Sequence, residues 1–292
     1  MQKIRKAVIP AAGFGTRVLP ASKAVPKEMI AIVDKPAIQY IVEEAAASGI
    51  TDILIITNRG KGDIEDHFDR SPDLERRLLE SGKQDLYDSV IHCAQLANIY
   101  SLRQKEAKGL GHAVSCARSF IGDEPFAVLY GDDVIISENP VLGQLMEAYD
   151  RFGKGVVGVK EMPREVVMRG SSLKVEALGD RYYSCTDMIE KPKSPDLLFS
   201  NFTVLGRCIL PPDIFDILEA TQPGANGEIQ LTDAMAQLAR TEGMTAVDFD
   251  GRRFDLGNKL GMLQASVEVG CKHPEIGESF RKYLIELVEG MK

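Results

Sequence analysis

The first 35 residues concentrate groups that can bind phosphate. The apolar run Ala7–Ile9 leads to Gly13 and Gly15, and several cations follow within a dozen positions. Glycines let backbone N–H groups approach a ligand closely, and N–H groups together with cations are what a polyphosphate requires. These 35 residues hold seven Lys or Arg against two acids, whereas the whole chain has a net charge of −8 at pH 7. A basic island in an acidic chain predicts one anionic ligand rather than a nucleic-acid surface.

The same turn does not fit the dinucleotide-binding fingerprint G-x-G-x-x-G. Val18 stands where the third glycine is needed, and the segment that would form the crossover helix carries Pro20 and Pro26. Proline inside a helix costs about 3 kcal/mol, so two prolines exclude a nicotinamide-dependent dehydrogenase. The G-x-x-x-x-G-K-[ST] phosphate loop does not occur in the sequence. A strand-closing turn beside ordinary surface lysines remains the alternative to phosphate binding.

A second group of candidate residues follows the apolar run Phe126–Tyr130, which ends at two carboxylates. Mg²⁺ typically takes one or two carboxylates together with substrate phosphates, which makes Asp132 a candidate metal ligand. A turn or helix-capping acid is the alternative at this position. Because successive strand residues point to opposite faces, we expect Asp133 to point away from such a site.

The N-terminal segment resembles the signature of the sugar-1-phosphate nucleotidyltransferases, in Gly13–Arg17, Leu19–Pro20, Lys23, Pro26–Met29 and Asp34–Pro36. Its longer form, K-A-x-P-K-E-M, is similar to that of the bacterial UTP–glucose-1-phosphate uridylyltransferases. Further matching segments occur in the order that this family shows and span most of the chain: Lys108–Ala113, Glu190–Pro192, Gly227–Ala234 and Asp255–Gly261.

The resemblance implies a nucleotide site and a metal site. It assigns the nucleotide contacts to Ala11, Ala12, Gly13, Gly15, Thr16, Gln104, Gly109 and Asp132. Gln104 and Gly109 would contact uracil, whose edge offers the donor and the acceptor that a glutamine amide matches. Asp132 and Asp255 would hold Mg²⁺. His112, which follows the glycine turn inside a helical pattern, is expected to be structural.

The resemblance also implies the residues that act on the sugar phosphate and the leaving group. Glu190 would bind glucose hydroxyls, Lys191 the phosphate of glucose 1-phosphate, and Gly170 the sugar through its backbone. Arg17 and Lys27 would hold the leaving pyrophosphate. An exposed acid–base pair before a proline is the ordinary alternative for Glu190 and Lys191.

The histidines bear on the mechanism. The chain has four, His67, His92, His112 and His273, and none form the H-x-H spacing of a covalent uridylyl transferase. This predicts direct in-line attack of glucose 1-phosphate on UTP, to give UDP-glucose and pyrophosphate. The resemblance implies that the nucleotide binds first. A thymidylyltransferase or another sugar specificity stays open, because one methyl group discriminates by only ~1–3 kcal/mol. An inactive nucleotide-sugar-binding module is disfavoured because Lys27, Asp132, Lys191 and Asp255 are all present.

Short apolar runs alternate with helical patterns, which predicts an α/β fold: a Rossmann-like, mainly parallel or mixed central sheet with helices on both faces. Residues 170–210 predict a small strand-rich addition, and the end of the chain predicts C-terminal helices. We expect a single domain over 1–292, with 1–135 mainly nucleotide-binding, 136–260 mainly sugar-phosphate-binding, and 261–292 available for contacts in a homodimer or homotetramer. Helices are expected over 37–48, 63–81, 112–120 and 140–152, with 257–270 and 275–289 at the end.

Length and composition limit the class of protein. At 292 residues with 44% hydrophobic content, the chain can form one large domain. No apolar run approaches the ~20 residues of a membrane span, so no membrane partner is expected. The five cysteines are an odd number, are scattered and lack a C-x-x-C spacing, which is typical of reduced thiols in the cytoplasm.

Overall fold

A computed structural model describes residues 2–291. The first half of the chain supplies four parallel strands, in the spatial order β5 (Asn98–Arg103), β4 (Asp52–Thr57), β1 (Lys6–Pro10) and β6 (Phe126–Leu129). β1, β5 and β6 each end just before a segment that the sequence marked as functional. Because parallel strands direct their carboxyl ends to one edge, the sheet gathers those segments there.

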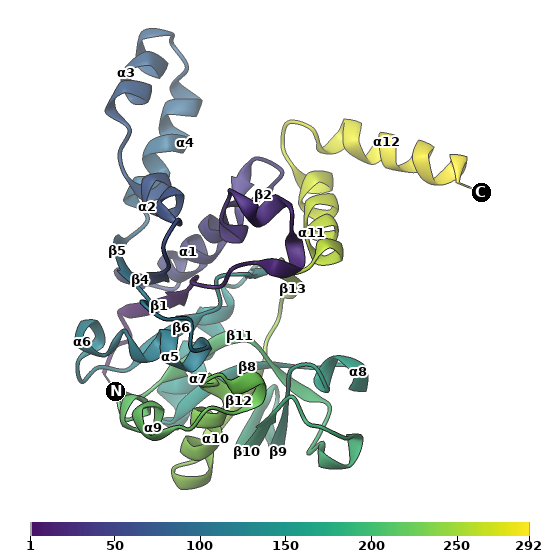
Figure 1. Cartoon of the computed structure of the whole chain (residues 1–292). Helices are drawn as coiled ribbons and strands as arrows, with labels where there is room; N and C mark the ends of the chain where they lie inside the picture. Colours follow the sequence, from purple (N-terminus) through teal and green to yellow (C-terminus); the bar gives the residue numbers. More distant parts are fainter. Residues whose placement is uncertain (1, 292) are drawn as a thin grey trace.

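The second half of the chain extends the same sheet to nine strands (Figure 1). Beyond β6 come β11 (Phe202–Leu210), β8 (Gly155–Glu161), β12 (Met244–Asp248), β10 (Tyr182–Glu190) and β9 (Ser171–Gly179). Only β8 and β12 pair in parallel here; the other pairings from β6 outward are antiparallel. The sheet is therefore mixed, with its parallel character concentrated in the nucleotide-side half, and the strand-rich addition is β9 with β10.

Helices cover both faces of the sheet because alternate residues of each strand enter different cores. Ala7 and Ile9 of β1 pack in one core with α1 (Ala37–Ala47) and α7 (Val141–Phe152). Val8 lies in the other core, and three helices complete it: α5 (Leu110–Ser115), α9 (Ile214–Ala220) and α10 (Leu231–Thr241). All three β1 side chains are fully buried, as expected for a strand in a sheet covered on both faces.

The segment after β1 forms no crossover helix. It folds as three short 3₁₀ turns and a two-stranded ribbon: η1 (Thr16–Val18), η2 (Ala21–Lys23), η3 (Lys27–Met29), β2 (Ala31–Ile32) and β3 (Lys35–Pro36). Pro20 and Pro26 each directly precede one of these turns. The proline argument against a dinucleotide fold is confirmed.

A second small sheet joins the two halves of the sequence. β7 (Asp133–Ile136) follows β6 directly and pairs antiparallel with β13 (Arg252–Asp255). The register places Asp255 opposite Asp133, and the backbone N–H of Leu256 donates to the carbonyl of Asp132 at 2.9 Å. Two aspartates more than a hundred positions apart therefore become neighbours.

Two helical segments differ from the sequence-based expectation. The segment 63–81 forms α2 (Gly62–Phe68) and α3 (Pro72–Glu80), because Pro72 starts a new helix. The unpredicted α4 (Gln84–Gln95) runs back beside α3, and the pair projects from the body (Figure 1). The segment 112–120 divides into α5 and α6 (Arg118–Ile121). A further short helix, α8 (Arg164–Val167), precedes β9.

The chain ends in two helices, as predicted, α11 (Lys259–Lys272) and α12 (Gly277–Gly290). α11 packs against β13, whereas α12 extends away from the body (Figure 1). α12 leaves large apolar side chains exposed, among them Tyr283, Ile285 and Val288. Over residues 2–291, every helix is too short or too polar to cross a membrane.

A buried ion pair joins the helical layer to the centre of the sheet. The Arg207 side chain on β11 is completely buried and donates to Glu44 of α1, with Nη2 to Oε2 at 2.6 Å. Glu44 also accepts from the backbone N–H of Leu142 at the start of α7, at 3.0 Å. One carboxylate thus connects α1, β11 and α7.

We expect Arg207→Met to lower the free energy of unfolding by about 3–5 kcal/mol, because it leaves the Glu44 carboxylate buried without its cation. Urea denaturation monitored by circular dichroism measures the loss. The double variant Arg207→Met with Glu44→Gln should recover much of it, since a neutral amide still accepts from Leu142. A single variant within 1 kcal/mol of wild type would contradict this account.

Candidate active site

A cavity of about 340 Å³ opens at the carboxyl ends of β1 and β6. Most of the residues that the sequence assigned to the nucleotide lie around it: Ala12, Gly13, Thr16, Lys27, Gln104, Gly109 and Asp132. Phe14, Tyr130 and Glu228 complete much of the wall. The parallel half of the sheet therefore brings the glycine turn, the Gln104 loop and the Asp132 turn to one place.

Gly15 makes the tight turn of the nucleotide loop possible. Its φ of 67° is left-handed, and a Cβ there would lie 3.1 Å from Cβ of Ser22 and 3.2 Å from Cβ of Lys27. The Gly15 carbonyl accepts from the Ser22 hydroxyl at 2.7 Å. The turn holds η3, which carries Lys27, close behind the loop.

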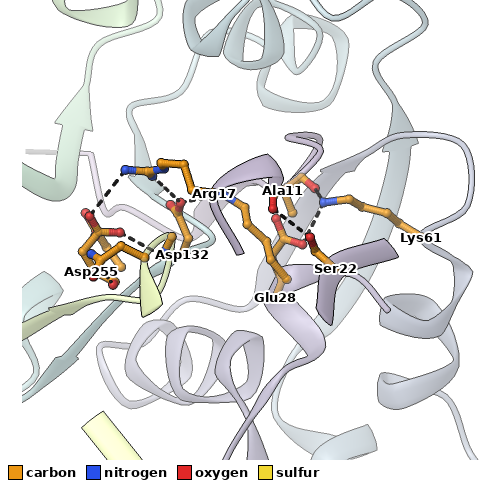
Figure 2. A network of polar contacts seen from close by, with 12 residues as sticks. Ala11, Arg17, Ser22, Glu28, Lys61, Asp132 and Asp255 are labelled. Carbon is orange, nitrogen blue, oxygen red and sulfur yellow. Dashed lines mark hydrogen bonds and ion pairs between the residues drawn. The ribbon is translucent and has the colours of Figure 1, made fainter. Parts of the chain in front are cut away.

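Glu28, Asn58 and Lys61, which the sequence analysis did not single out, hold this loop in place. Figure 2 shows Glu28 and Lys61 beside Ala11. The Lys61 ammonium lies between the carbonyl of Ala11 and the carboxylate of Glu28, with Nζ to Oε2 at 2.7 Å. The Asn58 amide donates to the carbonyl of Ala12. Lys61 and Glu28 are both almost fully buried, and burial lowers the pKa of Lys61 and raises the pKa of Glu28. In the sequence, Lys61 is a lysine shortly after an apolar run, and neither its burial nor its partner Glu28 could be read from that position.

Ala11 occupies the floor of the site rather than its wall. Its N–H donates to the carbonyl of Ile56 at 2.8 Å, and its carbonyl accepts from Lys61. Both polar backbone groups are therefore used within the protein, and the residue is 1% exposed. The structure places Ala11 as an anchor of the loop.

Asp132 and Asp255 face the same cation across the β7–β13 junction. Arg17 lies 4.0 Å from Asp132 and 3.8 Å from Asp255, as Figure 2 shows. A Cβ added to Gly257 would lie 2.9 Å from Oδ2 of Asp132 and 2.9 Å from Oδ1 of Asp255. Both carboxylates therefore line one small space that exists because residue 257 has no side chain.

Lys27 neutralises Asp132 directly, with Nζ to Oδ2 at 2.5 Å. Burial raises the pKa of Asp132, but Lys27 and Arg17 outweigh that effect and the pKa lies below its usual value. Burial lowers the pKa of Lys27, but the Asp132 and Glu28 carboxylates raise it by more, so the pKa lies above its usual value. Both groups are therefore charged at neutral pH.

Asp133 points away from this space, as expected, but strand alternation is not the cause: β6 ends at Leu129, and a turn in which the Asp133 N–H donates to the Tyr130 carbonyl at 3.2 Å separates it from β7. Its carboxylate accepts from Arg253 at 2.9 Å to Nε, and it packs beneath Gly206. Burial raises the pKa of Asp133 to about 6. Among the residues from 2 to 291, no three His, Cys, Asp or Glu side chains converge as a closed metal cage. The space beside Gly257 thus offers two carboxylates with room for other ligands.

The Gln104 loop is held by the segment that the resemblance marked as Gly227–Ala234. Ile229 N–H donates to the Lys108 carbonyl, and Gly111 N–H donates to the Ile229 carbonyl, both at 2.8 Å. Gly109 has φ 103°, and a Cβ there would lie 2.7 Å from Cβ of Glu228. This close pairing places Gln104, 8% exposed, in the wall of the cavity rather than on the surface.

The three predicted sugar-side residues lie together at the end of β10. Lys191 N–H donates to the Gly170 carbonyl at 2.7 Å, and Lys191 Nζ lies 3.7 Å from the Glu190 carboxylate. Burial raises the pKa of Glu190. None of the three lines the 340 Å³ cavity. The structure therefore shows a group of nucleotide-side residues around the cavity and a separate group of sugar-side residues beside the end of β10.

The comparisons with known proteins agree with this arrangement. The model of the nucleotidyl transferase family matches residues 6–270. The UTP–glucose-1-phosphate uridylyltransferase YngB of Bacillus subtilis (strain 168) is 52% identical, over 99% of this chain and 97% of the relative. A second uridylyltransferase of that organism is 49% identical, over 100% and 98%.

Solved structures give the same result. A UDP-glucose pyrophosphorylase complexed with UDP-glucose superposes with a TM-score of 0.85 at 41% identity, covering 93% of this chain and all of the other. The UTP-bound enzyme from Acinetobacter baumannii gives a TM-score of 0.88 at 37% identity, covering 98% and 100%. The matches cover both halves of the sheet, and the chain is an enzyme that belongs to the nucleotidyl transferase family.

Proposed function

We propose that this enzyme transfers the uridylyl group of UTP to glucose 1-phosphate, forming UDP-glucose and releasing pyrophosphate. The observation that carries the proposal is the cluster of Arg17, Lys27, Asp132 and Asp255, of which Lys27 and Asp132 line a cavity that also contains Gln104. That combination suits a pyrimidine triphosphate. Relatives about 50% identical over their full length bear the name of this activity.

The chain's own residues account for direct in-line displacement. Arg17 and Lys27 bind the leaving pyrophosphate, and Lys191 binds the attacking phosphate of the sugar. Glu190 accepts hydrogen bonds from the glucose hydroxyls, and the Gly170 backbone lines the sugar. Phosphoryl-group transfer depends mainly on positioning and on charge stabilisation, so no protein nucleophile is required. The nucleotide binds first, in the deeper cavity.

The residues beside Gly257 fit a divalent cation, because two carboxylates converge there on a space that a cation occupies in the form of the Arg17 guanidinium. Asp132 and Asp255 would hold Mg²⁺, which typically takes one or two carboxylates and completes its ligands with phosphate and water. Bound there, Mg²⁺ would supply positive charge beside the substrate phosphates. Arg17, whose side chain is 64% exposed, would bind phosphate.

Two further expectations concern the setting of the enzyme. Self-association as a homodimer or homotetramer is supported by the exposed apolar side chains of α11 and α12, including Leu263, Ile285 and Val288. A cytoplasmic location is supported by five free thiols, of which Cys185 and Cys208 are buried.

The first experiment measures pyrophosphate release by the purified protein with Mg²⁺ and glucose 1-phosphate, comparing UTP, dTTP, CTP, ATP and GTP. We expect release with UTP at least tenfold faster than with any other nucleotide, and none when the sugar phosphate is omitted. Equal or faster release with dTTP would replace the uridylyl assignment by a thymidylyl one. No release with any nucleotide would overturn the proposed activity.

Gly257→Ala tests the two-carboxylate site. The added Cβ would stand 2.9 Å from an oxygen of each aspartate, so we expect the Mg²⁺ concentration for half-maximal activity to rise at least tenfold. Gly143→Ala is the matched control, because its Cβ has only Ser48 Oγ within 4 Å, at 3.8 Å, and alanine suits its helix. Unchanged Mg²⁺ activation in Gly257→Ala would remove the metal assignment.

Lys27→Met tests the leaving-group role. Loss of one well-placed electrostatic group typically lowers the rate about 10²–10³-fold, and we expect a fall of that size in kcat. Lys3→Met, at an exposed position, should leave kcat unchanged. A kcat for Lys27→Met within threefold of wild type contradicts the assignment.

A further inference from the structure

The Gln104 side chain is held by two partners, Gly109 in the cavity wall and His112 outside it. Its Nε2 donates to the Gly109 carbonyl at 3.2 Å and lies 2.8 Å from Nδ1 of His112. Its backbone N–H donates to the carbonyl of Thr57 at 2.9 Å, which fixes the start of the side chain. His112 does not line the cavity, whereas Gln104 does.

These partners decide which end of the amide faces the ligand. A backbone carbonyl only accepts hydrogen bonds, so the end of the amide beside Gly109 must be the NH₂ group. The Oε1 atom makes no hydrogen bond to residues 2–291 and is not among the side-chain oxygens sealed from solvent. Because the side chain lines the cavity, the free acceptor Oε1 is the atom available to a ligand.

The same geometry fixes the state of His112. Since Gln104 presents NH₂ to Nδ1, that nitrogen must accept, and the proton of the neutral ring lies on Nε2. Partial burial lowers the pKa of His112, and Lys108 lowers it further, while Glu106 opposes them. α9, α10 and β1 pack on the same helix, yet the charged groups acting on the ring are those two loop residues. The neutral ring is therefore the form present at physiological pH.

We propose that His112 is a positioning residue that sets base specificity, by holding the Gln104 amide with Oε1 toward the base. The inference rests on the proposed function, since it concerns the pyrimidine of that substrate. Uracil carries an N3–H donor, which Oε1 can accept. Cytosine has an unprotonated N3 that also only accepts, so it meets Oε1 acceptor to acceptor. Thymine shares the N3–H of uracil and is not rejected by this device.

The test compares two substitutions of His112. His112→Leu has no acceptor for Gln104, so we expect the KM for UTP to rise about fivefold to tenfold with kcat within threefold. The ratio of kcat/KM for UTP to that for CTP should fall at least fivefold, because only the longer hydrogen bond to the Gly109 carbonyl, at 3.2 Å, then opposes a turn of the amide that brings NH₂ to N3 of cytosine. His112→Asn places Oδ1 near the position of Nδ1, and it should stay within threefold of wild type in both measurements.

A nitrogen-15 NMR spectrum of the His112 ring at pH 7.5 gives a reading that does not depend on activity. We expect Nδ1 to be unprotonated and Nε2 to carry the proton, with His112→Leu identifying the signal. An Nδ1-protonated ring overturns the inference, and this reading stands even if His112→Leu folds poorly, since His112→Asn can identify the signal instead.

The kinetic outcomes separate the two proposals. Wild-type enzyme that turns over UTP, together with a His112→Leu variant of unchanged UTP-to-CTP selectivity, overturns the role of His112 alone. Wild-type enzyme that turns over no pyrimidine triphosphate overturns the proposed function, and the specificity role with it.

Discussion

The buried pair of Lys61 and Glu28 is the interaction on which the site depends. Removing two charges from water costs several kcal/mol for each, and the pair is tolerated because it is tightly hydrogen-bonded. Lys61 also donates a hydrogen bond to the carbonyl of Ala11, and Glu28 is adjacent to Lys27 in the chain. One ammonium group therefore fixes both the floor of the nucleotide loop and the turn that carries the Lys27 cation.

The β7–β13 junction fixes the positions of the two carboxylates. Asp132 and Asp255 are more than a hundred positions apart in the sequence, and an antiparallel pairing of four residues on each strand brings them together. The glycine at 257 keeps the space between them open. Backbone pairing between β7 and β13 thus positions the two carboxylates, and the buried Lys61–Glu28 pair positions the turn that carries Lys27.

Much of this could be predicted from the sequence, because glycines, prolines and apolar runs act locally. Gly15, Pro20 and Pro26 predicted a turn without a helix, and the helix expected over 140–152 is present as α7 (Val141–Phe152). The direction of Asp133, away from Asp132, was also expected. α4 was not predicted, and none of its side chains is buried in the core.

The partners of buried polar groups could not be predicted, because they are set by tertiary contacts. Lys61 and Asn58 look like ordinary loop residues until the sheet places them beneath the nucleotide loop. Only the resemblance assigned Gln104 to the base, and in the structure the Gly227–Ala234 segment packs on its loop and encloses it. His112 was expected to be structural because it follows the glycine turn inside a helical pattern, and its contact with the Gln104 amide is a tertiary one.

The ion pairs of Arg17 and Lys27 with Asp132 and Asp255 make the ligand-free site an internal salt, with two cations balancing two carboxylates. Its field at a distance is weak, so inorganic phosphate and other abundant cellular anions gain little by entering. If the site acts as proposed, a phosphate chain arriving with its own counter-cation would exchange partners instead: the carboxylates would hold the cation, and Arg17 and Lys27 would hold the phosphates. Charge would be conserved in that exchange, which would favour the metal–nucleotide complex over either ion alone.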